Sequence, residues 1–304
     1  MLLFCCLQGL LRAQNAVNEG PFYWQLQVDN DISAQTDRQY TAGFVYEQTH
    51  LNLGEGWPAR LLLFRHEAVH TGWRLDLKLF TPKDIFTDSP PVEDRPYAST
   101  LLVYLFNRSF HPSNTWVESS WGMGLVGPSS QSWRLQNLIH ALTPHSEDAV
   151  GWKYQVADAF LLQAEVQMRQ LFYQNKVLAL IADAHARLGS GHTDATMGME
   201  LRLGYLPDWK DEQRMKREMH RVWLFVRPQL QATAFNVTLE SSLIGSYSAL
   251  LHRLIEVGVG RMEIGLRYRW SLAELEVMHT FLSPEFQGGP FHAWGSLRAR
   301  FQLE

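Results

Sequence analysis

Cysteine is almost absent from the sequence. The only two, Cys5 and Cys6, lie within the first ten residues. Residues 2–11 are mainly apolar and polar residues follow them, which is typical of a secretory signal peptide, and we expect this peptide to comprise residues 1–14. The remaining chain, residues 15–304, contains no cysteine. An exported protein without disulfides must take its stability from its sheet, its core or a membrane.

Long hydrophobic runs and an excess of basic charge are also absent. The longest apolar runs, such as 101–106, are far shorter than the roughly 20 residues that a membrane-spanning helix requires. The chain has 27 basic and 31 acidic side chains and a net charge of -4, so it lacks the electrostatic pattern of a nucleic-acid-binding protein. We therefore expect neither a helical membrane protein nor a nucleic-acid partner. A membrane β-barrel remains compatible, because its strands alternate apolar and polar residues.

The dominant periodicity of the sequence is two, which is typical of β-strands. In residues 196–205 apolar side chains alternate with polar ones or glycine, and 262–270 and 292–303 repeat this pattern. Such segments have roughly 10 to 14 residues, which exceeds the five or six common in globular proteins and suits a transmembrane strand. The predicted strands cover 22–31, 38–49, 72–80, 97–107, 116–126, 159–172, 177–189, 194–206, 221–235, 252–264, 265–283 and 292–303.

We therefore predict an all-β fold, a twelve-stranded antiparallel outer-membrane β-barrel with a helix-containing extracellular loop. Because the number of strands is even, both termini lie in the periplasm, and odd strands end at the extracellular rim. Residues 30–31, 41 and 94–97 then lie at this rim, as does the connection 127–158. That long connection contains a predicted helix from about residue 130 to 142, and connections of this length usually have a function.

Two groups of residues are candidates for chemistry. Side-chain oxygens gather at 29–31 and 36–41, and clustered oxygens are what hard cations bind, although a solvated turn has a similar composition. In the predicted helix Gln136 and His140 are spaced i and i+4, so an amide and an imidazole share one face. This pair suits a general base and a group that orients the substrate. Alternation from Leu26 places Asn30 on the lipid side of its strand, so the predicted site lies at the barrel wall.

Several short motifs occur together in one order along the chain. They are D-N-D (29–31), T-D-R-Q-Y-T-A-G (36–43), F-T-P-K-D-I (80–85), D-R-P-Y-A (94–98), G-P-S-S (127–130), Q-N-L-I-H (136–140) and G-W-K-Y-Q (151–155). This set resembles the outer-membrane lipid A 3′-O-deacylases (LpxR-like) over roughly residues 24–158, with weaker similarity to the end of the chain. The resemblance implies a twelve-stranded barrel that uses Ca²⁺.

The resemblance also implies a reaction, which is hydrolysis of the ester-linked 3′-acyloxyacyl chain of lipid A in lipopolysaccharide. His140 would be the general base that activates a water, with Asn30, Thr41 and Gln136 around the metal and the ester. Asp31 and Glu147 would bind calcium. A basic residue would bind the substrate, and Lys83, Arg95 and Arg74 are the candidates. We expect a monomer in the outer membrane with lipid as its neighbour.

The residues leave three other hypotheses open. His66-Glu67-Ala68-Val69-His70 has the H-E-x-x-H form of a zinc protease, which requires a helix at this position. A non-catalytic barrel, either a pore or an adhesin, is the second. A serine-dependent outer-membrane phospholipase acting on another acylated lipid is the third, with Ser129 and Ser130 as candidate nucleophiles. The chain has no G-x-S-x-G motif, which favours a water nucleophile.

Overall fold

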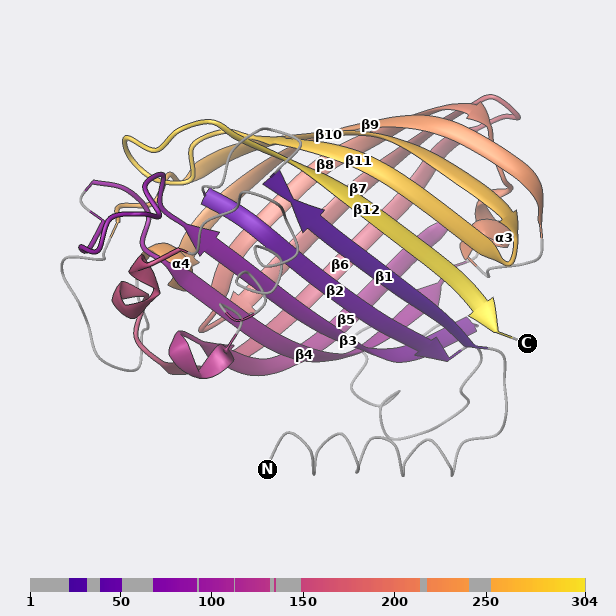
Figure 1. Ribbon diagram of the computed structural model, residues 1–304. Helices are drawn as coiled ribbons and strands as arrows, with labels where there is room; N and C mark the ends of the chain where they lie inside the picture. The colour runs from indigo at the N-terminus through magenta and orange to yellow at the C-terminus, as the bar shows by residue number, and fades with distance from the viewer. Residues whose placement is uncertain are drawn as a thin grey trace, which may run out of the picture.

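The computed structural model describes residues 22–31, 39–50, 68–91, 93–111, 113–131, 134, 149–213, 218–240 and 253–303, so the predicted signal peptide lies outside the described residues. The described residues form a closed antiparallel barrel of twelve strands, in which β1 pairs with β12 (Figure 1). The predicted fold class is confirmed. The strands are β1 (Phe22–Asn30), β2 (Gln39–His50), β3 (Ala68–Thr81), β4 (Ala98–Phe110), β5 (Thr115–Val126), β6 (Ala159–Gln174), β7 (Leu178–Gly189), β8 (His192–Tyr205), β9 (Glu218–Asn236), β10 (Gly258–Ser271), β11 (Ala273–Leu282) and β12 (His292–Leu303).

The helices among the described residues are short and lie in connections between strands. The helices are η3 (Pro128–Ser130), η4 (Gly151–Tyr154), α3 (Trp209–Gln213) and α4 (Val237–Glu240). No helix among the described residues is long and apolar enough to cross a membrane. The predicted helix over 130–142 lies almost wholly outside the described residues. Figure 1 shows α4 and the β5–β6 connection at one end of the barrel, and α3 with the C-terminus at the other.

The predicted strand boundary near residue 264 was wrong. β10 continues to Ser271 and β11 begins at Ala273, so the reversal occurs at Leu272. The alternation of 262–270 is unbroken because these residues form a single strand, which pairs Trp270 with Ala273. Ser271 has a φ of 50°. A left-handed conformation is uncommon for a serine, and the sequence therefore gave little sign of a turn here.

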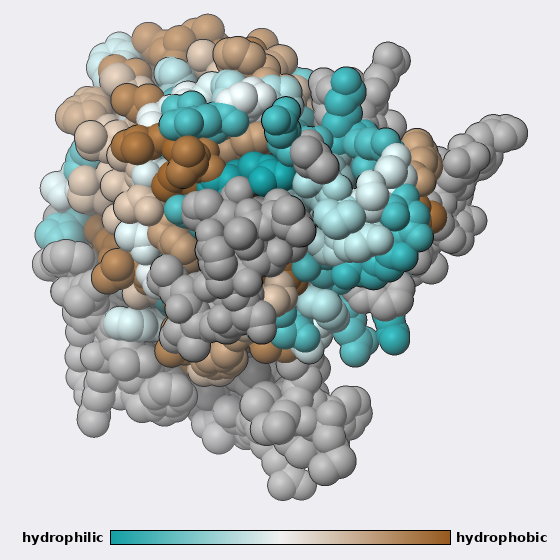
Figure 2. Space-filling model, turned by 90° about the vertical axis from the view of Figure 1, so that its left-hand side faces the viewer, coloured by the Kyte–Doolittle hydropathy of each residue, from teal (hydrophilic) through white to brown (hydrophobic). Residues whose placement is uncertain are grey.

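The outer face of the barrel is apolar, while the lumen is charged. On β8 the outward side chains Met197, Met199, Leu201 and Leu203 are all exposed. The inward Glu200 is fully buried and forms ion pairs with Arg169 at 2.7 Å, Arg202 and Arg227. A soluble protein would show the reverse arrangement, whereas a transmembrane barrel presents its apolar residues to lipid. Figure 2 shows the end that carries α4, where hydrophilic residues gather over one part and hydrophobic residues border it.

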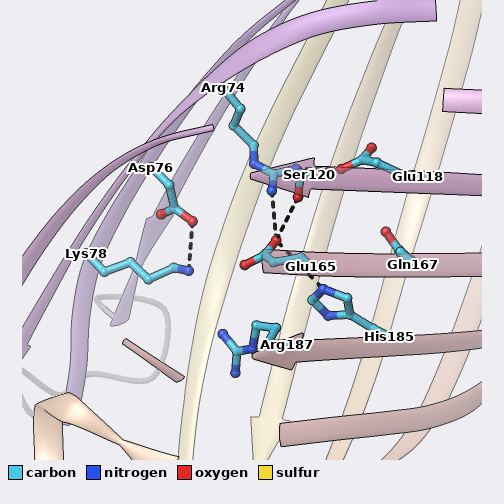
Figure 3. Close-up of a pocket in the computed structure, with 9 residues that line it drawn as sticks. All are labelled: Arg74, Asp76, Lys78, Glu118, Ser120, Glu165, Gln167, His185 and Arg187. Carbon is cyan, nitrogen blue, oxygen red and sulfur yellow. Dashed lines mark hydrogen bonds and ion pairs between the residues drawn. The ribbon is translucent and has the colours of Figure 1, made fainter. Parts of the chain in front are cut away.

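Apolar side chains close the lumen near both ends. At the extracellular end, residues from strand ends and α4 form one buried cluster, which includes Tyr40, Phe80 and Val237. At the periplasmic end Trp209 of α3 packs against Trp116 and Ile181. Between these two apolar clusters lies a cavity of about 190 Å³, which is lined by nine charged or polar side chains (Figure 3). The described lumen is thus a filled interior and not an open channel.

Candidate active site at the extracellular rim

A β-bulge occurs at Thr41, near the start of β2. Tyr40 pairs with Phe80 of β3 and Ala42 pairs with Leu79, so Thr41 is the extra residue on its strand. A bulge interrupts the alternation of side chains and redirects one of them. Tyr40 and Ala42, two positions apart, would share a face in a regular strand. They instead lie in two different clusters, one in the lumen and one outside the wall.

Hydrogen bonds show where the side chains around the bulge point. The Tyr40 hydroxyl donates to Asp29 Oδ2 at 2.7 Å, and this carboxylate is on the lumen face of β1. The Thr41 hydroxyl lies 2.5 Å from that of Thr81, the last residue of β3. Because Thr81 follows the lumen-facing Phe80, its side chain lies on the outer side of the wall. The bulge therefore directs the Thr41 hydroxyl outward and buries it there.

The structure brings Asn30 and Asp31 to the same place. Asn30 pairs with Ala42. Asp31, which follows Asn30, therefore lies beside Thr41, which precedes Ala42. Asn30 shares its face with Leu26 and Val28, which are exposed by 38% and 43%. Asp31 is buried, with 1% of its surface exposed. Three predicted site residues, Asn30, Asp31 and Thr41, thus meet at one hairpin end.

Two extracellular connections cover the outer wall beside this hairpin. Ile85 and Trp152, from the β3–β4 and β5–β6 connections, pack with Ala42 and Leu79 in one buried cluster. The main-chain N–H of Val150 donates to the carbonyl of Ile85 at 3.1 Å, which joins the two connections. Outside the barrel there is therefore a second layer of chain, and the predicted site lies at its edge.

The two ends of the β5–β6 connection are fixed to the barrel. The hydroxyl of Ser99 lies 2.6 Å from that of Ser130 and donates to Gln155 Oε1 at 3.1 Å. The main-chain N–H of Ser129 donates to Asp158 Oδ1 at 2.6 Å. The motifs G-P-S-S (127–130) and G-W-K-Y-Q (151–155) therefore form the stem of this connection, which holds its two ends.

Three predicted site residues belong to the connection above this stem. Gln136, His140 and Glu147 lie outside the described residues, so their roles stay predictions. The stem nevertheless holds the start and the end of their segment beside the covered wall.

The candidate basic residues lie in different surroundings. The guanidinium of Arg95 is fully buried, donates to Glu285 Oε2 at 3.1 Å and Thr238 Oγ1 at 3.0 Å, and stacks on Phe80. Burial lowers the pKa of Arg95 and Glu285 opposes this shift, but an arginine stays protonated. Contact with a substrate would require exposure of this buried guanidinium. Lys83, by contrast, is exposed on the same connection.

Arg74, the third basic candidate, lies away from the rim. Its guanidinium is in the lumen, where it pairs with Glu118 at 2.9 Å and Glu165 at 3.0 Å. Figure 3 shows it among the side chains around the internal cavity. The structure therefore does not bring Arg74 together with Asp31 and Thr41.

The oxygen chemistry at the hairpin fits calcium. Asp31 supplies a carboxylate, and Asn30 and Thr41 supply neutral oxygens, which are the donors that calcium prefers. Over the described ranges no group of three histidine, cysteine, aspartate or glutamate side chains could hold a metal ion. A complete set of ligands thus requires groups from elsewhere, and Glu147 is the predicted one.

The zinc-protease hypothesis is contradicted by the secondary structure. β3 begins at Ala68 and includes His70, so the described part of the H-E-x-x-H segment is a strand. A helix brings two histidines four residues apart close enough to bind one zinc ion, whereas on a strand they would be roughly 13 Å apart. His70 is buried and packs against Phe110, with 4.9 Å between ring centres.

Comparison with known proteins agrees with the motifs and the barrel. A family model described as "Outer membrane protein LpxR" matches residues 1–303. The chain belongs to the LpxR family. Its fold is similar to that of LpxR from Salmonella typhimurium, with a TM-score of 0.73 and 16% identity over 92% of this chain and 99% of that one. The family and the barrel together identify an outer-membrane protein.

Other comparisons add less. The β-domain of the Bordetella autotransporter BrkA gives a TM-score of 0.50 at 10% identity, over 93% of this chain and 99% of that one. This likeness concerns the barrel architecture alone. A comparison with curated proteins by sequence gives no match.

Sequence reasoning missed several residues of this region. Thr81, Glu285 and Thr238 come from three different connections or strand ends, and each contacts a predicted site residue. No local motif marks Glu285 or Thr238, because their roles depend on which strand ends the closed barrel brings together. Thr81 lies in the motif F-T-P-K-D-I (80–85), but the motif does not show its contact with Thr41. Asp94 and Gln155 lie within recognised motifs, and those motifs were the available signal.

Proposed function

We propose that this member of the LpxR family is a calcium-dependent hydrolase that removes an ester-linked acyl chain, the 3′-acyloxyacyl chain, from lipid A. Family membership supports a role on lipid A, and the barrel places the chain in the membrane that contains it. The observation that supports this proposal most directly is the outward-facing bulge at Thr41, beside Asn30 and Asp31. It puts polar groups on the lipid side of the wall, where an ester in the outer leaflet can reach them.

The position of the site suggests how a lipid would approach. Leu26 and Val28 face lipid directly below Asn30 on β1. On β3, Leu77 is partly buried against the covered cluster, while Leu79 is fully buried beneath it. An acyl chain lying along this wall would remain in apolar surroundings while its ester reached the edge of the cover.

Each predicted residue has a role in this proposal. His140 accepts a proton from the attacking water, and Gln136 orients the ester or the water. Asn30 and Thr41 surround the ester, while Asp31 and Glu147 are the calcium ligands. Lys83, which is exposed at the rim, binds the anionic head of the substrate, and Arg95 is buried in the same connection. Bound calcium would supply the positive charge that polarises the ester carbonyl and stabilises the oxyanion.

The phospholipase alternative requires a reactive serine beside a histidine. In the structure the Ser129 hydroxyl donates to Asp158 Oδ2 at 2.9 Å, and Ser130 contacts Ser99 in the stem of the connection. These contacts give both serines structural positions. Replacing Ser129 by Ala should leave lipid A hydrolysis unchanged within about twofold, whereas loss of a true nucleophile costs several orders of magnitude.

The proposal is tested by mass spectrometry of lipid A incubated with the detergent-folded protein, in calcium or in a chelator. We expect loss of an acyloxyacyl mass in calcium, no loss in the chelator, and recovery when calcium is restored. His140→Ala should abolish the reaction, while His111→Ala, at the other end of the barrel, is the matched control. An unchanged lipid A mass with the wild-type protein in calcium would contradict the proposal.

A further inference from the structure

Asp94 lies in the β3–β4 connection, and its carboxylate accepts three hydrogen bonds. Oδ2 accepts from the main-chain N–H of Lys83 at 2.6 Å. Oδ1 accepts from the main-chain N–H of Arg95 at 2.8 Å and from the side-chain amide of Gln39 at 3.1 Å. An ionised carboxylate has enough lone pairs for three donors. Asp94 therefore joins both ends of this connection to the first residue of β2.

Gln39 is the residue through which Asp94 acts on the bulge. It is buried and has a φ of 67°, a left-handed conformation that is uncommon for a residue with a side chain. Such a conformation persists only where surrounding contacts hold it. Gln39 lies two residues before Thr41, so its bond to Asp94 holds the segment that leads into the bulge.

Arg253, from the β9–β10 connection, holds the main chain around Asp94. Its Nε donates to the carbonyl of Asp94 at 2.5 Å, and its Nη2 donates to that of Pro91 at 3.0 Å. The neighbouring Arg95 reaches Glu285 of the β11–β12 connection. Three extracellular connections therefore meet at Asp94 and Arg95.

We propose that Asp94 is a positioning residue. It fixes the positions of Lys83 and Arg95 relative to the bulge at Thr41. The proposal rests on the hydrolase function above, because Asp94 acts on the reaction only through these groups. A displacement of about 1 Å among reacting groups can cost about a hundredfold in rate.

The first test is Asp94→Asn, which keeps the shape of the side chain but replaces one acceptor oxygen by an NH₂ group that faces an N–H donor. We expect kcat for lipid A to fall by about tenfold to a hundredfold, with KM within about twofold of wild type. The matched control is Asp88→Asn. Asp88 is an exposed carboxylate of the same connection and pairs with Lys153 at 2.6 Å. This control should retain the wild-type kcat.

The second test measures position without turnover. Spin labels at Ser89→Cys and Lys176→Cys, in a chain with Cys5 and Cys6 replaced by serine, report the distance between the β3–β4 connection and the opposite end of the barrel. Pulsed electron paramagnetic resonance should give a narrow distribution for wild type and Asp88→Asn, and a broad one for Asp94→Asn. The reason is that the broken bonds release both ends of the connection.

The two tests separate the possible failures. If the wild-type protein does not hydrolyse lipid A, the proposed function fails, and the distance distribution alone decides the role of Asp94. An Asp94→Asn distribution as narrow as that of Asp88→Asn would overturn the positioning role, as would an unchanged kcat in an active protein.

Discussion

Arg95 is the residue that links the extracellular connections most closely. It is fully buried, and the carboxylate that pairs with it comes from a segment 190 positions away in the sequence. Phe80 lies under the guanidinium, and 4.3 Å separates the guanidinium carbon from the centre of the Phe80 ring. A charge in such a place is stable only with its partners, because an unpaired buried charge is costly.

Glu285→Gln should therefore lower the thermal stability of the folded barrel. Arg95 would keep a hydrogen-bond acceptor but lose the opposite charge. Since the side chain of Glu285 is 25% exposed, solvent reduces the loss, and we expect about 1–2 kcal/mol. Thermal unfolding followed by circular dichroism measures it, with Glu256→Gln on the neighbouring segment as the control. Equal melting temperatures for the two variants would contradict this role of the ion pair.

The role of His140 as a base predicts a dependence on pH. A base must be neutral, and an ordinary histidine becomes protonated below about pH 6.5. Hydrolysis of lipid A should therefore decrease about tenfold per pH unit in acid and level off above neutrality. The measurement is kcat between about pH 5 and pH 8 at saturating calcium. A flat profile over this range would exclude His140 as the base in the rate-limiting step.

Among the elements, the stem of the β5–β6 connection matters most for the proposed site. Gly127 begins this connection with a φ of 91°, and a Cβ there would lie 2.8 Å from the main-chain nitrogen of Asp158. Only glycine fits such a conformation and so close an approach. The stem therefore depends on the absence of a side chain at this position.

Gly127→Ala should move the stem and misplace the segment that contains His140. We expect lipid A hydrolysis to fall by about tenfold or more while the barrel still folds. Heat-modifiable migration on gels tests folding, and the mass-spectrometric assay tests activity. Gly258→Ala is the matched control, because a Cβ at that position meets no atom within 4 Å. Full activity in Gly127→Ala would show that the stem does not position the site.

The sequence predicted the barrel well because alternation marks each strand directly. Residues 196–205 alternate without interruption, and the structure confirms them as part of β8. The reversal at Leu272 and the bulge at Thr41 were not predicted. A serine with positive φ has no sequence signature, and the polar and small residues around Thr41 alternate too weakly to show where a bulge interrupts the pattern. The burial of Arg95 depends on contacts between distant connections, which no local pattern encodes.

At the scale of the whole molecule, the barrel closes on itself and its lumen is filled. Pairing of β1 with β12 leaves no open sheet edge. Glu212 of α3 pairs with Arg202 at 2.5 Å and with Arg267 at 3.3 Å, so α3 is held inside the periplasmic end. Burial raises the pKa of Glu212, but these arginines outweigh it and the pKa is lowered.

We therefore expect the protein not to conduct ions. In planar bilayers the purified wild-type protein should give no stepwise current, because an apolar cluster and α3 obstruct the two ends of the lumen. A porin of known conductance in the same bilayers is the positive control. Regular single-channel steps would instead support the non-catalytic pore.

In the proposed reaction, water cleaves an acyl ester of lipid A at the outer wall of the barrel. The most direct measurement is the reaction in H₂¹⁸O with calcium, followed by mass spectrometry of both products. We expect one ¹⁸O atom in the carboxylate of the released fatty acid and none in the deacylated lipid A. Absence of a released fatty acid, or transfer of the acyl chain to another lipid, would contradict it.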